Sequence, residues 1–249
     1  GMATLLRELK PLLHLGAMTV TGRTLGEEME RAGPGFQQTV VRSIGNPIYP
    51  QGGIAVLRGN LAPGGAIIKQ SAADPKLMEH EGRAVVFENI EDLVRRIDGD
   101  ELDVTAQDVL VLKNIGPKGA PGMPEAGYIP IPRKLARAGV KDIVRISDGR
   151  MSGTAFGTIV LHVTPESAAG GPLAHVRNGD RIRLSVERRE IALLVSAEEL
   201  ARRAQESPVT APTAERGYRK LFLQTVTQAD LGVDFDFLRA ARMVGKVPR

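Results

Sequence analysis

DIVRISDGRMSGTAFGTIVLHV, residues 142–163, joins two hydrophobic runs through a glycine-rich loop. Each run is hydrophobic at consecutive positions rather than at every second one, which is typical of strands that are covered on both faces of a sheet. Similar runs recur between glycine- and proline-rich loops from residue 50 onward. We therefore expect sheets covered on both sides, with strands near 54–59, 66–70, 83–88, 109–114, 142–147 and 158–163.

Shorter periodic segments complete the predicted fold. In 181–195, hydrophobic residues alternate on either side of a charged turn, which predicts a β-hairpin. Short helices are expected at 90–97 and 132–139, and Ser196 with Glu199 forms a capping pattern for a helix that runs to about residue 205. The fold class is then α/β and rich in strands.

The N-terminal segment predicts two helices with a strand between them. Leucines in 4–14 follow one helix face, and Thr4 stands where an N-cap is expected. A short strand is expected at 17–22. Thr24 and Glu27 then form a capping box, and the helix that they open ends at a glycine.

Composition excludes several classes of function. The 249 residues are 42% hydrophobic, enough for a sizeable core, but aromatic residues make up only 4% and Trp is absent. The net charge of +4 comes from basic residues interleaved with acids, so a nucleic-acid partner is not expected.

The hydrophobic runs are far shorter than the roughly 20 residues that span a bilayer, and no signal peptide is seen. We expect a cytoplasmic protein with no membrane contact. The absence of cysteine rules out disulfides and thiolate ligands within this chain.

Ser152 is the first candidate functional residue, because its glycine-rich loop lies between two predicted strand ends. A tight turn with an incidental serine is the alternative. A serine hydrolase elbow needs glycine two positions before and after the serine, where this chain has Arg150 and Thr154. His162 and His175 stay open as partners, since catalytic triads do not depend on sequence order.

Glu125 is the second candidate. It lies in NIGPKGAPGMPEAG, residues 114–127, a loop of glycines and prolines after the strand expected at 109–114. Glycine lets a backbone approach a ligand closely and proline stiffens the loop, so a carboxylate at its end is well positioned. A solvated loop acid is the alternative.

Three stretches are more specific than any single motif: VLKNIGPKGAPGMPEAGYIPIP at 111–132, VRISDGRMSGTAFGTIVLHVTPESAAGGPLAHVRNGDRI at 144–182, and GVDFDFL at 232–238. They closely resemble the C-terminal part of the dihydroxy-acid dehydratase and 6-phosphogluconate dehydratase family, often called IlvD/Edd. Within that family they look most like the sugar-acid dehydratases that act on arabinonate or xylonate. The likeness covers nearly the whole chain, to about Leu238.

The resemblance implies a hydro-lyase that converts a 2,3-dihydroxy acid into a 2-keto-3-deoxy acid. In such enzymes an iron-sulfur cluster, 2Fe-2S or 4Fe-4S, takes the leaving C3 hydroxyl, Mg²⁺ binds the carboxylate and C2 hydroxyl, and a serine alkoxide removes the C2 proton. Ser152 matches that base, Glu125 matches a magnesium ligand, and Thr154 matches a position beside the substrate. The implied fold is a swivelling β/β/α domain with a barrel-like β core and flanking helices.

A serine base without histidine needs a nearby cationic metal site. Zinc lowers the pKa of bound water from 15.7 to about 7, roughly 12 kcal/mol, whereas a helix N-terminus supplies about 0.3–2 kcal/mol. One carboxylate cannot hold Mg²⁺ alone, and a chain without cysteine cannot hold the cluster. The family likeness implies that the missing ligands belong to an N-terminal cluster-binding domain that this chain lacks. We therefore expect the isolated chain to be inactive.

The expected organisation is a swivelling domain at 1–206 followed by a C-terminal helical arm at 207–249, with a helical stretch at 215–231. The arm is expected to pack on the missing N-terminal domain or on a second subunit of a homo-oligomer. Ala126 and Gly149 depart from the residues that relatives often have, an aromatic residue and Ala, so the sugar acid is left open. A non-catalytic domain that binds a sugar acid or a partner protein is the rival interpretation.

Overall fold

The computed structural model describes residues 1–33, 35 and 37–238. The chain divides into two compact units, Gly1–Gly52 and Gly53–Arg249. The boundary predicted at residue 206 remains a prediction, and residues 239–249 of the predicted arm lie outside the described residues.

The first unit contains helices α1 (Met2–Leu9) and α2 (Leu25–Arg31), with the 3₁₀ turn η1 (Lys10–Leu12) after α1. Thr24 and Glu27 form the predicted capping box, because the Thr24 hydroxyl accepts from Glu27 N and the Glu27 carboxylate accepts from Thr24 N at 2.7 Å. Thr4 is not an N-cap as predicted, since α1 already begins at Met2. The strand predicted at 17–22 is reduced to an isolated bridge between Met18 and Thr24.

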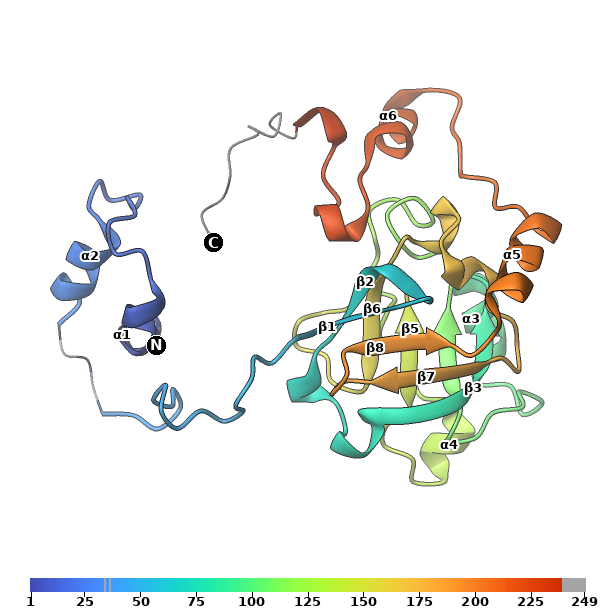
Figure 1. Ribbon diagram of the computed structural model, residues 1–249, viewed down its shortest axis with the longest axis horizontal. Coiled ribbons are helices and arrows are strands. Elements are labelled where there is room, and N and C mark those ends of the chain that lie inside the picture. The colour runs from blue at the N-terminus through green and yellow to red at the C-terminus, as the bar shows by residue number, and fades with distance from the viewer. Residues whose placement is uncertain (34, 36, 239–249) are drawn as a thin grey trace. The chain divides into compact units, whose positions relative to one another are not determined.

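The second unit is built on a closed barrel of eight strands, ordered β1-β2-β6-β5-β4-β3-β7-β8 around its wall (Figure 1). This confirms the strand-rich α/β class and the barrel-like core with flanking helices. The strands are β1 (Ala55–Gly59), β2 (Ala62–Ile68), β3 (Glu79–Phe87), β4 (Val109–Leu112), β5 (Val144–Ser147), β6 (Ile159–Thr164), β7 (Arg181–Ser185) and β8 (Glu190–Leu193).

The wall of the barrel has a parallel part and an antiparallel part. β3, β4, β5 and β6 pair in parallel with one another, whereas β7 and β8 form the predicted hairpin. The carboxyl ends of the four parallel strands therefore meet at one end of the barrel. In parallel sheets this is the end where binding sites are usually built.

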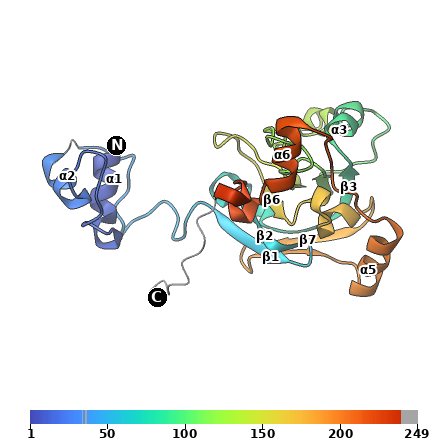
Figure 2. The ribbon, with the colours of Figure 1, turned by 90° about the horizontal axis from the view of Figure 1, so that it is seen from above.

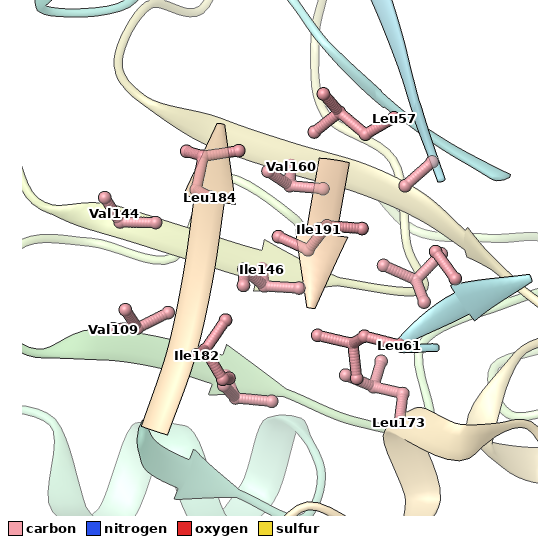
Figure 3. Packing of buried hydrophobic residues seen from close by; sticks show 14 of the residues in the cluster. Leu57, Leu61, Val109, Val144, Ile146, Val160, Leu173, Ile182, Leu184 and Ile191 are labelled. Atoms are coloured by element: carbon pink, nitrogen blue, oxygen red, sulfur yellow. The ribbon is translucent and has the colours of Figure 1, made fainter. Parts of the chain in front are cut away.

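The parallel strands β4, β5 and β6 are buried on both faces, as predicted, whereas β1, which was also expected to be covered on both sides, alternates between buried and exposed residues. Val109 and Val111 of β4 point into the barrel interior, where they join the side chains shown in Figure 3. Leu110 and Leu112 of the same strand point outward into a second cluster, which is covered by residues of α3 (Ile90–Arg96) and α4 (Arg133–Arg137). Each fully buried side chain of this size stabilises the fold by about 1.5–3 kcal/mol.

The helices after the barrel are α5 (Ala197–Glu206) and α6 (Gly217–Thr225). Ser196 caps α5 through its hydroxyl, which accepts from Glu199 N, as predicted. The 3₁₀ turn η6 (Ala229–Leu231) lies against β6 (Figures 1 and 2). The other 3₁₀ turns are η2 (Gln70–Ala72), η3 (Pro75–Leu77), η4 (Ser167–Ala169), η5 (Pro172–His175) and η7 (Asp236–Leu238). None of the helices described has the length and hydrophobicity that a bilayer crossing requires.

Candidate functional site

Two loops meet at the carboxyl end of the parallel strands. The loop 114–127 follows β4, and the loop 148–157 follows β5. Gly127 N donates to the carbonyl oxygen of Arg150 at 2.8 Å, and Arg150 Nε donates to the carbonyl oxygen of Met123 at 2.7 Å. The two stretches that the sequence singled out are therefore joined directly.

Arg150 also connects the two loops through a side-chain ion pair. Its Nη1 donates to Glu125 Oε1 at 2.9 Å, and Ser152 follows two residues later. Both side chains of the pair are nearly half exposed, at 44% for Arg150 and 48% for Glu125. An ion pair this exposed contributes at most about 1 kcal/mol to folding. The Glu125 carboxylate is thus held in place while it stays accessible to a ligand.

Ser152 is half-buried, and its Oγ lies 3.0 Å from Thr154 Oγ1. Lys69 Nζ donates to the carbonyl oxygen of Gly153 at 2.6 Å, which places an ammonium group beside the loop. Within the described part of the chain, the side-chain hydrogen bond of Ser152 is to Thr154 and not to an imidazole. This arrangement gives no support to the serine hydrolase alternative.

His162 supports the serine loop through its backbone. It lies in β6 at a positive φ of 54°, where the register between β2 and β6 shifts, and its N donates to the carbonyl oxygen of Gly149 at 3.0 Å. Irregular pairing of this kind redirects backbone groups out of the ladder. Burial, together with the charge of Arg150, lowers the pKa of the His162 imidazole. His162, which the sequence left open as a catalytic partner of Ser152, thus contacts the serine loop through its backbone N at Gly149.

Asp148 is the first residue of the serine loop and is fully buried. Its carboxylate accepts from Ile115 N at 2.9 Å, from Asn114 N at 3.3 Å and from Ser167 N at 2.8 Å. Burial raises the pKa of Asp148, and these three donors oppose that shift by favouring the ionised form. Asp148 therefore fastens the start of the loop 114–127 to the ends of β5 and β6.

Glu166 follows β6 and is 1% exposed. Its Oε2 accepts from Lys118 N at 2.9 Å and from Gly119 N at 3.0 Å. A Cβ on Gly116 would lie 2.6 Å from Glu166 Oε2, so only glycine lets the loop approach this carboxylate so closely. Burial raises the pKa of Glu166, the hydrogen bonds oppose that shift, and the charge of Asp148 adds to it.

The sequence did not identify Lys69, Arg150, Asp148 or Glu166 as parts of this site. Lys69 and Arg150 carry no local signal, because each contact depends on how the chain folds back. The two buried acids do carry one, since each closely follows a predicted strand, in VRISD and in LHVTPE. An acid just after such a strand is a reasonable candidate for a loop anchor.

The described residues contain no complete metal site. Glu125 has the accessible carboxylate that Mg²⁺ prefers, but Mg²⁺ takes about six oxygen ligands in octahedral geometry. Among residues 1–33, 35 and 37–238, no three acidic or histidine side chains gather to hold an ion. The chemistry of the accessible Glu125 carboxylate fits one of these oxygen ligands. An iron-sulfur cluster does not fit this chain by itself, because the sequence has no cysteine.

The fold and the two joined loops define a class of protein: a strand-rich α/β barrel domain with a polar site at the carboxyl ends of its parallel strands. Residues 39–233 match the model of the dihydroxy-acid/6-phosphogluconate dehydratase C-terminal family. The chain belongs to this family, and the relatives below are named dehydratases, which are hydro-lyases.

Three relatives illustrate the range of the family. The L-arabonate dehydratase of Azospirillum brasilense is 49% identical over 97% of this chain and 43% of its own length. The 6-deoxy-6-sulfo-D-gluconate dehydratase of Pseudomonas putida is 48% identical over 100% of this chain and 43% of its own length. The dihydroxy-acid dehydratase of Dehalococcoides mccartyi (strain CBDB1) is 39% identical over 94% and 42%. The chain thus spans about two fifths of these relatives' lengths.

Proposed function

We propose that this chain is the C-terminal part of a hydro-lyase that dehydrates a sugar acid. The substrate class is a 2,3-dihydroxy acid and the product a 2-keto-3-deoxy acid. The relatives named for sugar acids are 48–49% identical, whereas the dihydroxy-acid dehydratase is 39% identical, which favours a sugar acid. The observation that carries the proposal is the joining of the Ser152 and Glu125 loops by Arg150.

In the proposed reaction, Ser152 Oγ acts as the base that takes the proton from C2. The C2–H electron pair becomes the C2=C3 double bond, the C3–O bond breaks, and the departing hydroxide leaves as water after gaining a proton. The resulting enol gains a proton at C3 and loses the proton of its C2 hydroxyl to solvent, which gives the 2-keto acid. Thr154 Oγ1, 3.0 Å from Ser152 Oγ, is the proposed neighbour of the substrate.

The cationic groups around the loop support a serine base that has no histidine. Lys69 Nζ donates to the carbonyl oxygen of Gly153, the residue after Ser152, and Arg150, two residues before Ser152, is paired with Glu125. Positive charge fixed near an oxyanion stabilises it, because the protein groups need no reorganisation when the charge forms. Mg²⁺, when bound at Glu125, supplies further charge for the substrate carboxylate and C2 hydroxyl.

We propose that an N-terminal domain of the same protein holds the iron-sulfur cluster and supplies the remaining magnesium ligands. The relatives' greater length supports this, because more than half of each lies outside the matched region. A cytoplasmic homo-oligomer, with no nucleic-acid or membrane partner, completes the proposal. This 249-residue chain by itself is expected to be inactive.

The test is an anaerobic assay of the full-length protein with Mg²⁺ and a panel of pentonates and hexonates, measuring 2-keto-3-deoxy acid. Ser152→Ala is expected to lower kcat by about 10²–10⁴, the usual contribution of a general base. Ser43→Ala, at an exposed serine of the first unit, is the matched control and should keep full activity. The proposal fails if protein with an intact cluster turns over no acid, or if Ser152→Ala retains wild-type kcat.

A further inference from the structure

Two buried carboxylates hold the stretch 114–119 through its backbone amides. Asp148 accepts from Asn114 N and Ile115 N, and Glu166 accepts from Lys118 N and Gly119 N. These four donors lie at the start of the loop that ends at Glu125. The first part of this loop is therefore held by hydrogen bonds to two buried carboxylates, which lie at the ends of β5 and β6.

Gln228, which precedes η6, forms two hydrogen bonds with Glu166. Its Nε2 donates to Glu166 Oε1 at 2.6 Å, and its Oε1 accepts from Glu166 N at 2.8 Å. The two residues are 62 positions apart in the sequence. The Glu166 side chain thus connects the segment after α6, through Gln228, to the loop that carries Glu125.

We propose that Glu166 is a positioning residue for Glu125, and that Gln228 makes the segment after α6 part of the support of the site. This inference rests on the proposed function, because it assumes that Glu125 binds Mg²⁺. Glu166 touches neither substrate nor metal in this proposal. It acts by fixing the backbone of the loop that carries Glu125, the proposed magnesium ligand.

The hydrogen-bond pattern at Glu166 requires an ionised carboxylate. Both oxygens accept N–H groups, from Lys118, Gly119 and Gln228, so a proton on either oxygen would face a donor. An amide in place of the carboxylate would meet the same conflict, because its NH₂ group can only donate. The Glu166→Gln variant should therefore release part of the loop while it preserves the volume of the side chain.

Asp108 offers a matched control away from the site. It is 4% exposed and, like Glu166, it holds a turn by accepting a backbone amide, from Thr105 N at 2.8 Å. It immediately precedes β4, at the opposite end of that strand from the loop 114–127. Asp108→Asn therefore tests the general effect of replacing a buried, hydrogen-bonded carboxylate by an amide, and it leaves the residues that support Glu125 unchanged.

The experiment uses the full-length protein and two measurements that need no turnover. Amide hydrogen exchange is followed over 114–127, and Mg²⁺ binding is measured by titration calorimetry. For Glu166→Gln we expect faster exchange at Lys118 and Gly119 and Mg²⁺ binding weakened by about 10-fold, the lower end of the effect of losing a hydrogen bond to a metal ligand itself, because Glu166 acts on Glu125 through the loop backbone. Asp108→Asn should change neither. Gln228→Ala, which keeps the carboxylate, should give a smaller change in the same direction.

Unchanged exchange in Glu166→Gln would overturn the inference, and so would faster exchange with unchanged Mg²⁺ affinity. An equal weakening of Mg²⁺ binding in Asp108→Asn would also overturn it, because the effect would then be one of general stability. If Glu166→Gln misfolds, Gln228→Ala decides by the same two measurements. Absence of sugar-acid turnover in the wild-type protein would count against the proposed reaction alone, since neither measurement depends on it.

Discussion

Arg150 Nη1 lies 2.9 Å from Glu125 Oε1, while the Nε of the same guanidinium donates to the backbone of the Glu125 loop. One side chain thus sets both the position of the loop and the orientation of its carboxylate. Arginine can do this because its guanidinium offers several donors in a fixed plane, whereas a lysine ammonium is a single point of charge.

Arg150→Lys is the first prediction. Because the ion pair is nearly half exposed, the free energy of unfolding should fall by only about 1 kcal/mol or less. Mg²⁺ binding by the full-length protein should weaken much more clearly, since lysine cannot reach both acceptors. Urea denaturation and Mg²⁺ titration measure the two effects. Arg188→Lys, in another exposed ion pair, is the control, and equal Mg²⁺ affinity in the two variants would contradict the prediction.

Thr154→Val tests the hydroxyl beside Ser152. Valine keeps the shape of threonine but removes the hydroxyl, and Thr154 is exposed, so thermal stability should hardly change. The kcat of the full-length protein should fall, because Ser152 Oγ loses its 3.0 Å partner, yet less than in Ser152→Ala, which removes the base itself. A Thr154→Val loss as large as that of Ser152→Ala would mean that the two hydroxyls have been assigned the wrong roles.

The pKa of Glu199 sets part of the way in which the free energy of unfolding responds to acid. Hydrogen bonds from Arg202 and Arg203 lower the pKa of Glu199 from 4.5 to about 2. A carboxyl with a lowered pKa in the folded state stabilises the protein above its unfolded pKa, and that contribution is lost as the pH falls from about 4.5 towards 2. Glu199→Gln should therefore flatten the fall in unfolding free energy over this range.

Urea unfolding between pH 2 and pH 6 measures the Glu199 effect. Glu91→Gln is the matched control, because Glu91 also lies in the first turn of a helix, where a carboxylate interacts with the helix dipole. If both variants flatten the pH profile equally, the effect belongs to helix starts in general and not to the arginine contacts of Glu199.

Sequence patterns predicted the elements of the barrel better than its supports. The hairpin of β7 and β8 and the α2 capping box depend on neighbouring residues, so periodicity and spacing suffice to find them. Thr4 was predicted as a cap because it precedes a leucine pattern, but the helix gains an extra turn from Met2. The roles of Ser152 and Glu125 came from family likeness. The support of the Glu125 loop depends on contacts of Glu166 with Lys118 and Gln228, which lie 48 and 62 residues away in the sequence, and no local pattern encodes such pairings.

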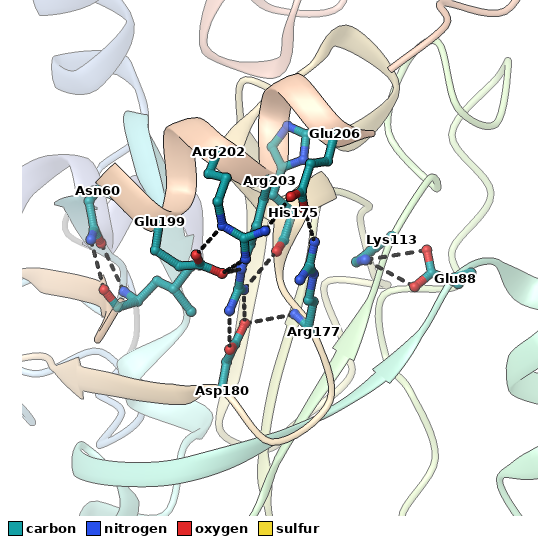
Figure 4. Close-up of polar contacts among 11 residues, drawn as sticks. Asn60, Glu88, Lys113, His175, Arg177, Asp180, Glu199, Arg202, Arg203 and Glu206 are labelled. Atoms are coloured by element: carbon teal, nitrogen blue, oxygen red, sulfur yellow. Dashed lines mark hydrogen bonds and ion pairs between the residues drawn. The ribbon is translucent and has the colours of Figure 1, made fainter. Parts of the chain in front are cut away.

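The ion pair of Arg203 and Asp180 is the last test, because it fastens α5 to the barrel (Figure 4). The Nη1–Oδ2 distance is 2.6 Å, and each side chain is only 10% exposed. Removing one partner leaves the other charge buried, which typically costs about 3–5 kcal/mol. Arg203→Met should lower the unfolding free energy by an amount near the lower end of this range, because Arg177 N still donates to Asp180. Glu206, at the end of the same helix, forms exposed pairs with Arg177 and Arg202, and Glu206→Gln should cost less than about 1 kcal/mol. Equal losses in urea denaturation would show that burial does not set the strength of these pairs.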